Sequence, residues 1–486
     1  MCKSWSVDPD APNILWIKGA PGTGKSAIAS SLVGELAINS ERIGSSFFFR
    51  GQESSTTTTV AFWRNAAYDF ARHPTIRKHL SGKIRNKEID FTTPDIKVTF
   101  RQLIKEPLMK VANLPIEQSP VIVVDALDEC GGLEGARSKE RRDLMITLGL
   151  WSEFCPNAKL IVLSREEYDI SQTLLQTRPR TIDLLTREDT VEQSKHDIQA
   201  FLAHELGHIA VYYQTLPVDW PGPQVTEALA IKANGLFIWA STAVRYIAAG
   251  DVEGRLEKIV RGEGEMNLAS LYTQILDVAF PKASDETLRE VHAILTVIIV
   301  AKKVLDVGTV AGLLMMRPST VERICNVLRS VLKSKKGLSF RHQSFVDFLM
   351  GTAYPALQIT AGDGHQLLAN QCLHVMKARL RFNICEISSS YLLNDQALKL
   401  IPSIETHIPS QLQYASQYWA DHLHDAFTSE ENMDLVRYVL KVQFLFWLEV
   451  VSLCKFMDEV HPILLTLIAW LKVTTKPCLI SLTDCF

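Results

Sequence analysis

The residues near the N-terminus that could do chemistry form a glycine-rich run that ends in a lysine and a serine. The run fits G-x-x-x-x-G-K-[ST], in which glycines let backbone N–H groups converge on an anion without an intervening Cβ. The lysine would bridge the β- and γ-phosphates of a nucleotide, and the serine hydroxyl would ligate Mg²⁺. The sequence therefore predicts a phosphate-binding loop formed by Gly19, Ala20, Pro21, Gly22, Thr23, Gly24, Lys25 and Ser26.

The context of this run argues against a chance match in a glycine-rich turn. The apolar residues 14–17 suit a buried strand, and residues 27–33 have helical spacing without proline. A strand, a glycine-rich turn and a helix are the setting that the motif requires, because the helix N-terminus adds partial positive charge.

A second candidate site follows residues 121–124, four β-branched apolar residues that predict a buried strand. This strand would deliver Asp125 to the mouth of a sheet, where it can hold Mg²⁺ directly or through water. Glu129 is placed to orient or deprotonate an attacking water, and Asp128 adds negative charge beside the metal. An ordinary buried strand with an acidic turn has the same pattern, but the phosphate-loop motif upstream favours the metal site.

Two further side chains follow predicted strands. Arg165 comes after the run 159–164, and its guanidinium could donate two hydrogen bonds to oxygens of the γ-phosphate. A solvent-exposed arginine at the end of a strand has the same sequence pattern. His342 comes after a short predicted strand at 338–340, where an exposed or hydrogen-bonded histidine is the plainer interpretation.

The elements that must position these residues alternate in the first 185 residues between apolar runs and helical patterns. Further strands are expected at 44–49 and 181–185, and from about residue 187 the pattern is helical. We therefore predict an α/β P-loop NTPase domain, with a parallel sheet and helices on both faces, followed by helical domains.

The second half of the chain has the outline of a winged helix, which is three helices followed by a β element. The strand at 338–340 would be that β element, and Ser344 with Asp347 has the spacing of a helix capping box. The three helical patterns are 288–300, 307–316 and 321–332. Without a basic recognition helix, a packing role is favoured over DNA binding.

Composition narrows the class of protein. A chain of 486 residues with 47% hydrophobic and 22% charged residues is globular, with about three or four domains. The net charge of −3, without a Lys/Arg-rich run, predicts no nucleic-acid partner. Nine cysteines without C-x-x-C spacing indicate free thiols rather than zinc or disulfides. Without a signal core or an apolar run long enough for a membrane span, a soluble cytoplasmic protein is expected.

The chain resembles the fungal NACHT proteins with a nephrocystin-3-like N-terminal region, which are relatives of the NOD-like receptors within the STAND class of signalling NTPases. The matching segments cover nearly the whole chain, and their order is more specific than the two nucleotide motifs. They are ILWIKGAPGTGKSAIASSL, the Phe-rich run 47–49, LIKEPL, VIVVDALDEC, LSREE, ANGLFIWASTAVRYI, LYTQIL, RHQSFVDFL and LQYASQYWADHL.

This resemblance implies a domain order and a reaction. The cofactors would be ATP or GTP with Mg²⁺, slow hydrolysis would yield the diphosphate, and the protein would close around ADP and open on exchange. Further copies of the chain or related NACHT proteins are candidate partners, and an immune role follows from the family only. The domains would be a NACHT domain at 1–186, a helical lid at 187–265, a winged helix at 266–355 and a helical domain without repeats at 356–486.

The resemblance also assigns roles by position. Gly19, Gly24, Lys25 and Ser26 would be phosphate-loop residues, as in the motif above. Asp125 and Glu129 would be the metal and water-activating acids, and Arg165 the sensor. His342 would contact the β-phosphate of ADP.

The sequence departs from the family pattern at two places. Glu166 stands where the sensor segment usually has proline, and Gly235-Leu236-Phe237 stands where relatives often have Gly-Leu-Pro. The chain begins about a dozen residues before the first predicted strand and ends at Phe486 without sensor repeats. We therefore expect the switch without its effector and sensor modules.

Three functions stay open at this point. The first is a slow NTPase switch of the STAND class. The second is a P-loop kinase of a small metabolite. No arginine-rich lid is evident in the sequence, and the C-terminal half is too large for such a kinase. The third is a non-hydrolysing interaction module that partners with longer relatives. The sequence does not specify whether the nucleotide is ATP or GTP.

Overall fold

The computed structural model describes residues 2–38, 44–51, 57–89, 93, 95–154, 157–184, 188–213, 215–217, 219–261, 267–389, 394 and 400–474. The chain divides into two compact units. The first comprises Met1–Gln274 together with His342–Ser344, and the second comprises Ile275–Arg341 and Phe345–Phe486.

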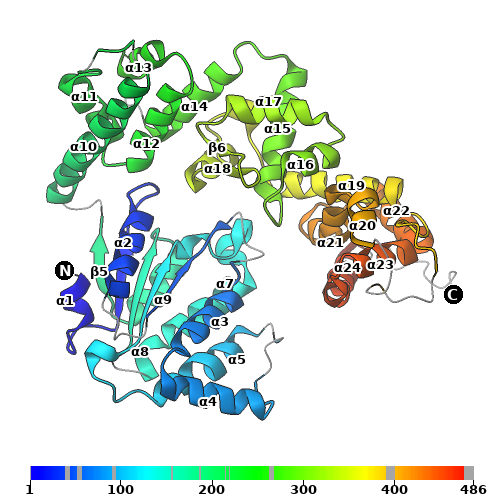
Figure 1. Cartoon of the computed structure of the whole chain (residues 1–486), viewed down its shortest axis with the longest axis horizontal. Helices are drawn as coiled ribbons and strands as arrows, with labels where there is room; N and C mark the ends of the chain where they lie inside the picture. The colour runs from blue at the N-terminus through cyan, green and yellow to red at the C-terminus, as the bar shows by residue number, and fades with distance from the viewer. Residues whose placement is uncertain are drawn as a thin grey trace. The chain divides into compact units, whose positions relative to one another are not determined.

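A five-stranded sheet forms the centre of the first unit (Figure 1). All its strands are parallel and lie in the order β2-β3-β4-β1-β5, so that β4 pairs with both β1 and β3. Parallel strands place their carboxyl ends at one edge, which is where open α/β sheets bind ligands. The strands are β1 (Ile14–Lys18), β2 (Gly44–Phe48), β3 (Val121–Asp125), β4 (Lys159–Ser164) and β5 (Arg180–Asp183).

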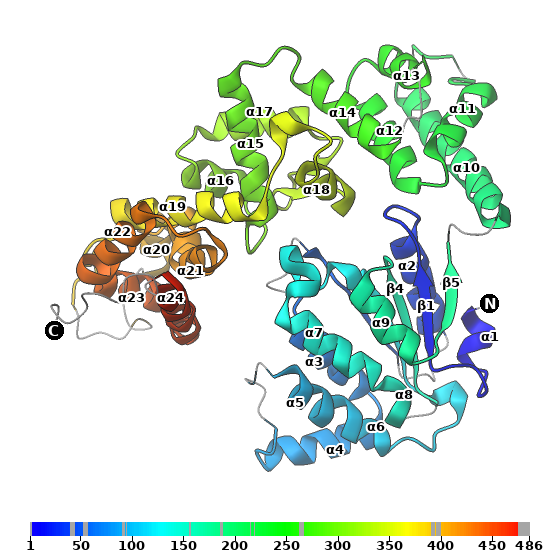
Figure 2. The ribbon, with the colours of Figure 1, turned by 180° about the vertical axis from the view of Figure 1, so that it is seen from behind.

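The central strands are buried on both faces because helices cover the sheet on each side (Figure 1, Figure 2). Alternate residues of β1 enter different cores, Ile14 and Trp16 on one side, Leu15 and Ile17 on the other. This burial explains why the strands read as continuous apolar runs. The smaller core contains residues of α1 (Cys2–Ser6) and α2 (Lys25–Ile38). The larger core contains residues of α3 (Thr59–Phe70), α4 (Pro74–Arg85), α5 (Ile96–Phe100), α6 (Glu106–Met109), α7 (Lys139–Gly149), α8 (Trp151–Phe154) and α9 (Tyr168–Gln176).

The predicted α/β class, a parallel sheet with helices on both faces, is confirmed. The predicted fifth strand, 181–185, is found at 180–183. Helix α3 begins at Thr59, where the Thr58 side chain accepts the amide of Ala61.

Five helices complete the first unit or lead out of it. The junction between α11 and α12 has left-handed backbone at Asn234 and Gly235, with φ of 46° and 77°. The helices are α10 (Glu188–Tyr212), α11 (Pro223–Ala233), α12 (Phe237–Ala248), α13 (Val252–Arg261) and α14 (Leu268–Ala279).

The second unit begins with three helices and a two-stranded antiparallel hairpin. The helix predicted at 321–332 is too long: α17 ends at Val327, and Leu332 lies in β6 opposite Phe340. The apolar periodicity runs on through the turn because Leu328, Val331 and Leu332 are buried as well. The winged helix itself stays a prediction. The elements are α15 (Asp285–Val300), α16 (Val307–Leu313), α17 (Pro318–Val327), β6 (Leu332–Lys333) and β7 (Ser339–Phe340).

The capping box predicted at Ser344 is wrong. Helix α18 (Gln343–Met350) begins before Ser344, and the Ser344 amide donates to Nδ1 of His342 at 3.1 Å. The ring of His342 thus takes the capping role that the spacing assigned to the serine hydroxyl.

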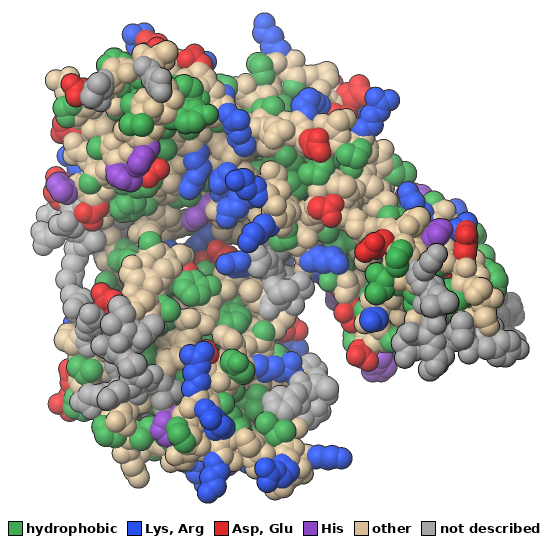
Figure 3. Space-filling model, viewed as in Figure 1, with side chains coloured by type: hydrophobic (Ala, Val, Ile, Leu, Met, Phe, Trp, Pro, Cys, Tyr) green, Lys and Arg blue, Asp and Glu red, His purple; other side chains and the backbone are tan. Residues whose placement is uncertain are grey.

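The rest of the second unit is helical. Trp419, Trp447 and Trp470 are buried and anchor its core. None of the described helices combines the length and apolar character needed to cross a bilayer. Charged side chains of both signs occur on the face drawn in Figure 3. The helices are α19 (Ala361–Arg379), α20 (Leu400–His407), α21 (Ser410–Asp425), α22 (Glu430–Tyr438), α23 (Phe444–Leu453) and α24 (Val460–Thr474).

Candidate functional site

The glycine-rich loop lies between the end of β1 and the start of α2. Gly22 and Gly24 have φ of 81° and 88°, a region that favours glycine because it has no Cβ. The loop is closed on itself by Thr23, whose amide and hydroxyl both donate to the carbonyl of Ala20. The loop therefore keeps a fixed curvature.

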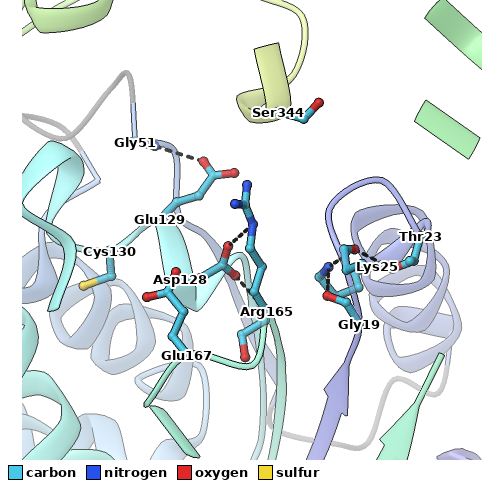
Figure 4. Close-up of polar contacts among 12 residues, drawn as sticks. Gly19, Thr23, Lys25, Gly51, Asp128, Glu129, Cys130, Arg165, Glu167 and Ser344 are labelled. Atoms are coloured by element: carbon cyan, nitrogen blue, oxygen red, sulfur yellow. Dashed lines mark hydrogen bonds and ion pairs between the residues drawn. The ribbon is translucent and has the colours of Figure 1, made fainter. Parts of the chain in front are cut away.

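The ammonium group of Lys25 lies across this loop (Figure 4). It donates to the carbonyl oxygens of Gly19 at 2.7 Å and Ala20 at 2.9 Å. Burial lowers the pKa of Lys25, while the carboxylate of Asp128 acts in the opposite direction. Lys25 is thus a partly desolvated cation whose present partners are neutral carbonyls.

Asp125 ends β3 and is only 3% exposed. Burial raises the pKa of its carboxyl group, and a hydrogen bond from the Ser26 side chain opposes that shift. A hydrogen bond from the Ala126 backbone opposes the shift as well. The Oδ1 atom of Asp125 is buried and has no hydrogen-bond partner among the described residues. A buried carboxylate oxygen without a donor is costly, so this atom fits a cation ligand.

The backbone turns sharply after Asp125. Ala126 has φ of 54°, a left-handed conformation that is strained for a residue other than glycine and that is found at functional sites. The turn leads directly into the 3₁₀ segment Leu127–Glu129 and thereby places Asp128 and Glu129 beside the end of the strand.

Glu129 is held by the segment that follows the neighbouring strand β2. Its Oε2 accepts the backbone amide of Gly51 at 3.0 Å (Figure 4). Burial raises the pKa of Glu129 to about 7, the charge of Asp128 adds to the rise, and the Gly51 hydrogen bond opposes it. A carboxylate with this pKa can exchange a proton near neutral pH.

Arg165 lies between the loop and the acids because β4 lies between β1 and β3 in the sheet. Its Nε is 3.0 Å from Oδ2 of Asp128, and its backbone amide donates to Oδ1 of the same carboxylate at 2.9 Å. Asp128 therefore orients Arg165, a contact that the sequence analysis did not foresee.

Arg141 on α7 is an organising residue that the sequence analysis missed. Its side chain is fully buried, and its Nε and Nη2 donate to the two carboxylate oxygens of Asp169 at 2.8 Å. Nη2 also donates to Glu167 at 2.6 Å, and Nη1 donates to the carbonyl of Asp128 at 2.8 Å. One guanidinium thus joins the turn after β3 to the segment after β4.

The sequence offered only a weak signal for Arg141. It stands in the charged run 139–142, which is typical of a solvated helix start. The acidic pair Glu166 and Glu167 after β4 could have suggested a cation nearby. Glu166, the residue in place of the family's proline, instead lies 2.7 Å from Nζ of Lys18 at the end of β1.

The start of α12 lies against the glycine-rich loop. The amide of Ile238 donates to the carbonyl of Gly22 at 3.3 Å. A Cβ at Gly22 would lie 1.8 Å from Cγ2 of Ile238, so this close approach requires glycine in addition to the left-handed φ. The segment 235–237, which departs from the family pattern, therefore directly precedes a residue in contact with the loop.

His342 groups with the first unit. Its Nδ1 accepts the Ser344 amide, and the Ser344 hydroxyl lies 2.8 Å from both that nitrogen and the Tyr272 hydroxyl. Burial lowers the pKa of His342 to about 4, and the positive charges of Arg165 and Lys25 act in the same direction. Because an amide can only donate, Nδ1 is an acceptor, and the proton of the neutral ring is on Nε2.

The structure thus gathers the predicted acids, Lys25 and Arg165 at the carboxyl edge of the sheet. Among the described residues, no group of three or more His, Cys, Asp and Glu side chains is arranged to hold a metal ion by itself. A magnesium site here would need oxygen ligands from a bound phosphate, as Mg²⁺ sites in nucleotide enzymes commonly have.

Comparison with known proteins shows which proteins the chain is similar to. A model of the nephrocystin 3 N-terminal region matches residues 1–165. The vegetative incompatibility protein HET-E-1 of Podospora anserina is 25% identical over 497 aligned residues, which cover 93% of this chain and 34% of that protein. The chain is NACHT-like. The resemblance drawn from the sequence is confirmed, and the NACHT-like chain spans about a third of the length of the curated relative that it matches.

Two solved structures show weaker likeness to the NACHT-like chain. A STAND protein with a tetratricopeptide repeat sensor from Pyrococcus horikoshii is 11% identical and has a TM-score of 0.40. Its alignment covers 98% of this chain and 64% of the Pyrococcus chain. A Walker-type ATPase of Pyrococcus abyssi is 13% identical and has a TM-score of 0.28. Its alignment covers 72% of this chain and 95% of the ATPase chain. The sheet topology described above, and not these two alignments, establishes the fold class.

Replacing Arg141 tests its organising role. We expect Arg141→Ala to lower the free energy of unfolding of the first unit by about 3 kcal/mol, because it leaves carboxylates and a carbonyl without their buried donor. The adjacent Arg142→Ala is the control, since Arg142 is exposed and should change stability by less than about 0.5 kcal/mol. Urea unfolding of the two variants measures the difference, and equal midpoints would contradict the role.

Proposed function

We propose that this protein is a nucleotide-dependent signalling switch of the STAND class that binds ATP or GTP with Mg²⁺ and hydrolyses it slowly. The observation that carries the proposal is the pairing of Ser26 with Asp125, whose buried Oδ1 has no hydrogen-bond partner among the described residues. These two residues come from the glycine-rich loop and from β3, the two places where the motifs put magnesium ligands.

The loop offers the phosphate site. Its glycines leave the backbone amides accessible to an anion, and the N-terminus of α2 adds partial positive charge. Lys25 would exchange its two carbonyl partners for phosphate oxygens, which are stronger acceptors for an ammonium group because they are charged. Gly19, Ala20, Pro21, Gly22, Thr23, Gly24, Lys25 and Ser26 would form this site.

The residues present fit Mg²⁺. Asp125 and Ser26 provide hard oxygen ligands. The Oδ1 atom of Asp125 is buried without a hydrogen-bond partner among the described residues, so a bound cation would stabilise it. The bound ion would neutralise charge on the phosphates. Ser26 and Asp125 are therefore proposed as the metal-holding residues of this chain.

Glu129 is proposed as the general base. Water would attack the γ-phosphorus, the bond from the γ-phosphorus to the bridging oxygen of the β-phosphate would break, and Glu129 would accept the water's proton. Its amide contact from Gly51 holds the carboxylate in place, and its pKa of about 7 is suited to base catalysis near neutral pH. Arg165, oriented by Asp128, would stabilise charge on the transferred group.

The switch would depend on contacts that differ between diphosphate and triphosphate. His342 is neutral with its proton on Nε2, and this N–H could donate to a β-phosphate oxygen, the role that the family resemblance assigns to it. Ile238 is in contact with the loop and would transmit its rearrangement to α12. A ligand shifts such an equilibrium only by its different affinity for the two states.

Two point variants separate binding from chemistry. We expect Lys25→Ala to abolish nucleotide binding, because it removes the cation of the phosphate site. Glu129→Gln should bind the triphosphate normally and lose about 10²–10⁴-fold in turnover, the usual contribution of a general base. Binding is measured by fluorescent-nucleotide titration and turnover by phosphate release.

Matched controls come from the exposed pair Glu257 and Lys258 on α13. Glu257→Gln and Lys258→Ala should behave like the wild type. Equal turnover of Glu129→Gln and the wild type would refute the base role. Tight binding without turnover in the wild type would instead favour a non-hydrolysing interaction module, and transfer of phosphate to an acceptor hydroxyl would favour a kinase.

The pKa of Glu129 predicts a pH dependence. Because that pKa is raised to about 7, the carboxylate is protonated below this pH and cannot accept the water's proton. We expect kcat/KM, which reports the free enzyme, to fall about tenfold per pH unit well below pH 7 and to level off above it. A profile that is flat between pH 5.5 and 8, or one that rises on acidification, would contradict the assignment.

A further inference from the structure

Two histidines lie one turn apart on the exposed face of α10. His204 and His208 are exposed, whereas Leu202, Leu206 and Ile209 on the same helix are buried. Histidine side chains are visible at the surface in the region of α10 (Figure 3). The buried residues pack the helix against its neighbours, so the backbone that carries the two imidazoles is held in place.

The two rings turn the same nitrogen toward each other. Nε2 of His204 and Nε2 of His208 are 3.2 Å apart, and the ring planes are 80° apart. Two histidines at i and i+4 project from one side of a helix, as in helical metal sites. The i, i+4 spacing was present in the sequence, but only the structure shows which nitrogens meet.

Glu205 selects the tautomer of His204. Its Oε1 lies 3.3 Å from Nδ1 of His204. Because a carboxylate accepts, Nδ1 of His204 carries the proton and the lone pair of the neutral ring is on Nε2, the atom that faces His208. A carboxylate on the far nitrogen of a ligating histidine is the usual second contact at metal sites, where it orients the ring and raises its basicity.

We propose that His204 and His208 bind one divalent transition-metal ion, such as Zn²⁺, through their Nε2 atoms. Two Zn–N bonds of about 2.0–2.1 Å at a tetrahedral angle place the nitrogens about 3.3 Å apart, close to the distance observed. Imidazole ligands suit Zn²⁺, Cu²⁺ or Ni²⁺, whereas Mg²⁺ requires oxygen. The proposed site is therefore distinct from the phosphate loop and does not rest on nucleotide binding.

The protein supplies two of the ligands. Since no group of three or more ligating side chains was found among the described residues, water or a ligand from another molecule completes the coordination. Without metal, the same separation suits a hydrogen bond from His208 Nε2–H to His204 Nε2. Metal binding requires the neutral His208 ring to take its other tautomer, with the proton on Nδ1. The site is thus open and exchangeable, unlike a closed structural zinc site.

The test is a titration of the full-length, EDTA-treated protein with zinc chloride, without nucleotide, by isothermal calorimetry. We expect wild type to bind one equivalent more than His204→Ala and one more than His208→Ala. His196→Ala is the matched control, because His196 is also exposed on α10 but lies two turns from His204, and it should bind as wild type does. Glu205→Gln should weaken the binding without removing it.

Equal zinc stoichiometry in wild type, His204→Ala and His208→Ala would overturn the proposal. The variants should fold, because alanine favours helix and the replaced side chains are exposed. Far-UV circular dichroism checks this, and Gln replacements serve as a second pair if the alanine variants lose helicity. As an independent readout, zinc should raise the thermal midpoint of wild type and of His196→Ala but not of the two site variants.

Discussion

The burial of a carboxylate at the carboxyl end of β3 is the constraint on which the first unit's site depends. Asp125 sits at the end of a strand whose residues are all buried, so its charge must be balanced locally. Parallel pairing brings the end of β1, and with it the glycine-rich loop, to the same edge of the sheet. Ser26 from that loop provides one hydrogen bond, and the remaining buried oxygen fits a hard cation. The topology thus brings the glycine-rich loop and a buried carboxylate to the same edge of the sheet.

Two arginines divide the acids around Asp125 into different roles. Arg165 engages Asp128, and Arg141 engages Glu167 and Asp169 and also holds the carbonyl of Asp128. Glu129 is left with a backbone amide as its partner, and its burial gives it the raised pKa that a base needs. Neighbouring carboxylates of one acidic turn therefore have different partners, an ion pair for Asp128 and a backbone amide for Glu129.

Local patterns in the sequence predicted the elements that chemistry requires, and they could not predict partners far apart in the chain. The glycine-rich turn between a strand and a helix and the buried strands at 121–124 and 159–164 follow from residue type and spacing, and each of these elements is found. The capping of α18 by His342 could not be foreseen, since serine is the commoner capping residue. Arg141 could not be assigned because its partners after β4 are brought to it only by the sheet order. The helix predicted to reach Leu332 shows that apolar periodicity does not separate a helix end from a buried short strand.

The most direct test of the central claim is to denature the purified protein and identify any released nucleotide by chromatography. The account predicts nucleoside diphosphate, ADP or GDP, at about one per chain, and the retention time identifies the base. A protein that is empty and also fails to bind added ATP or GTP with Mg²⁺ would contradict the account. The buried carboxylate of Asp125 and the glycine-rich loop would then have to be explained without a nucleotide.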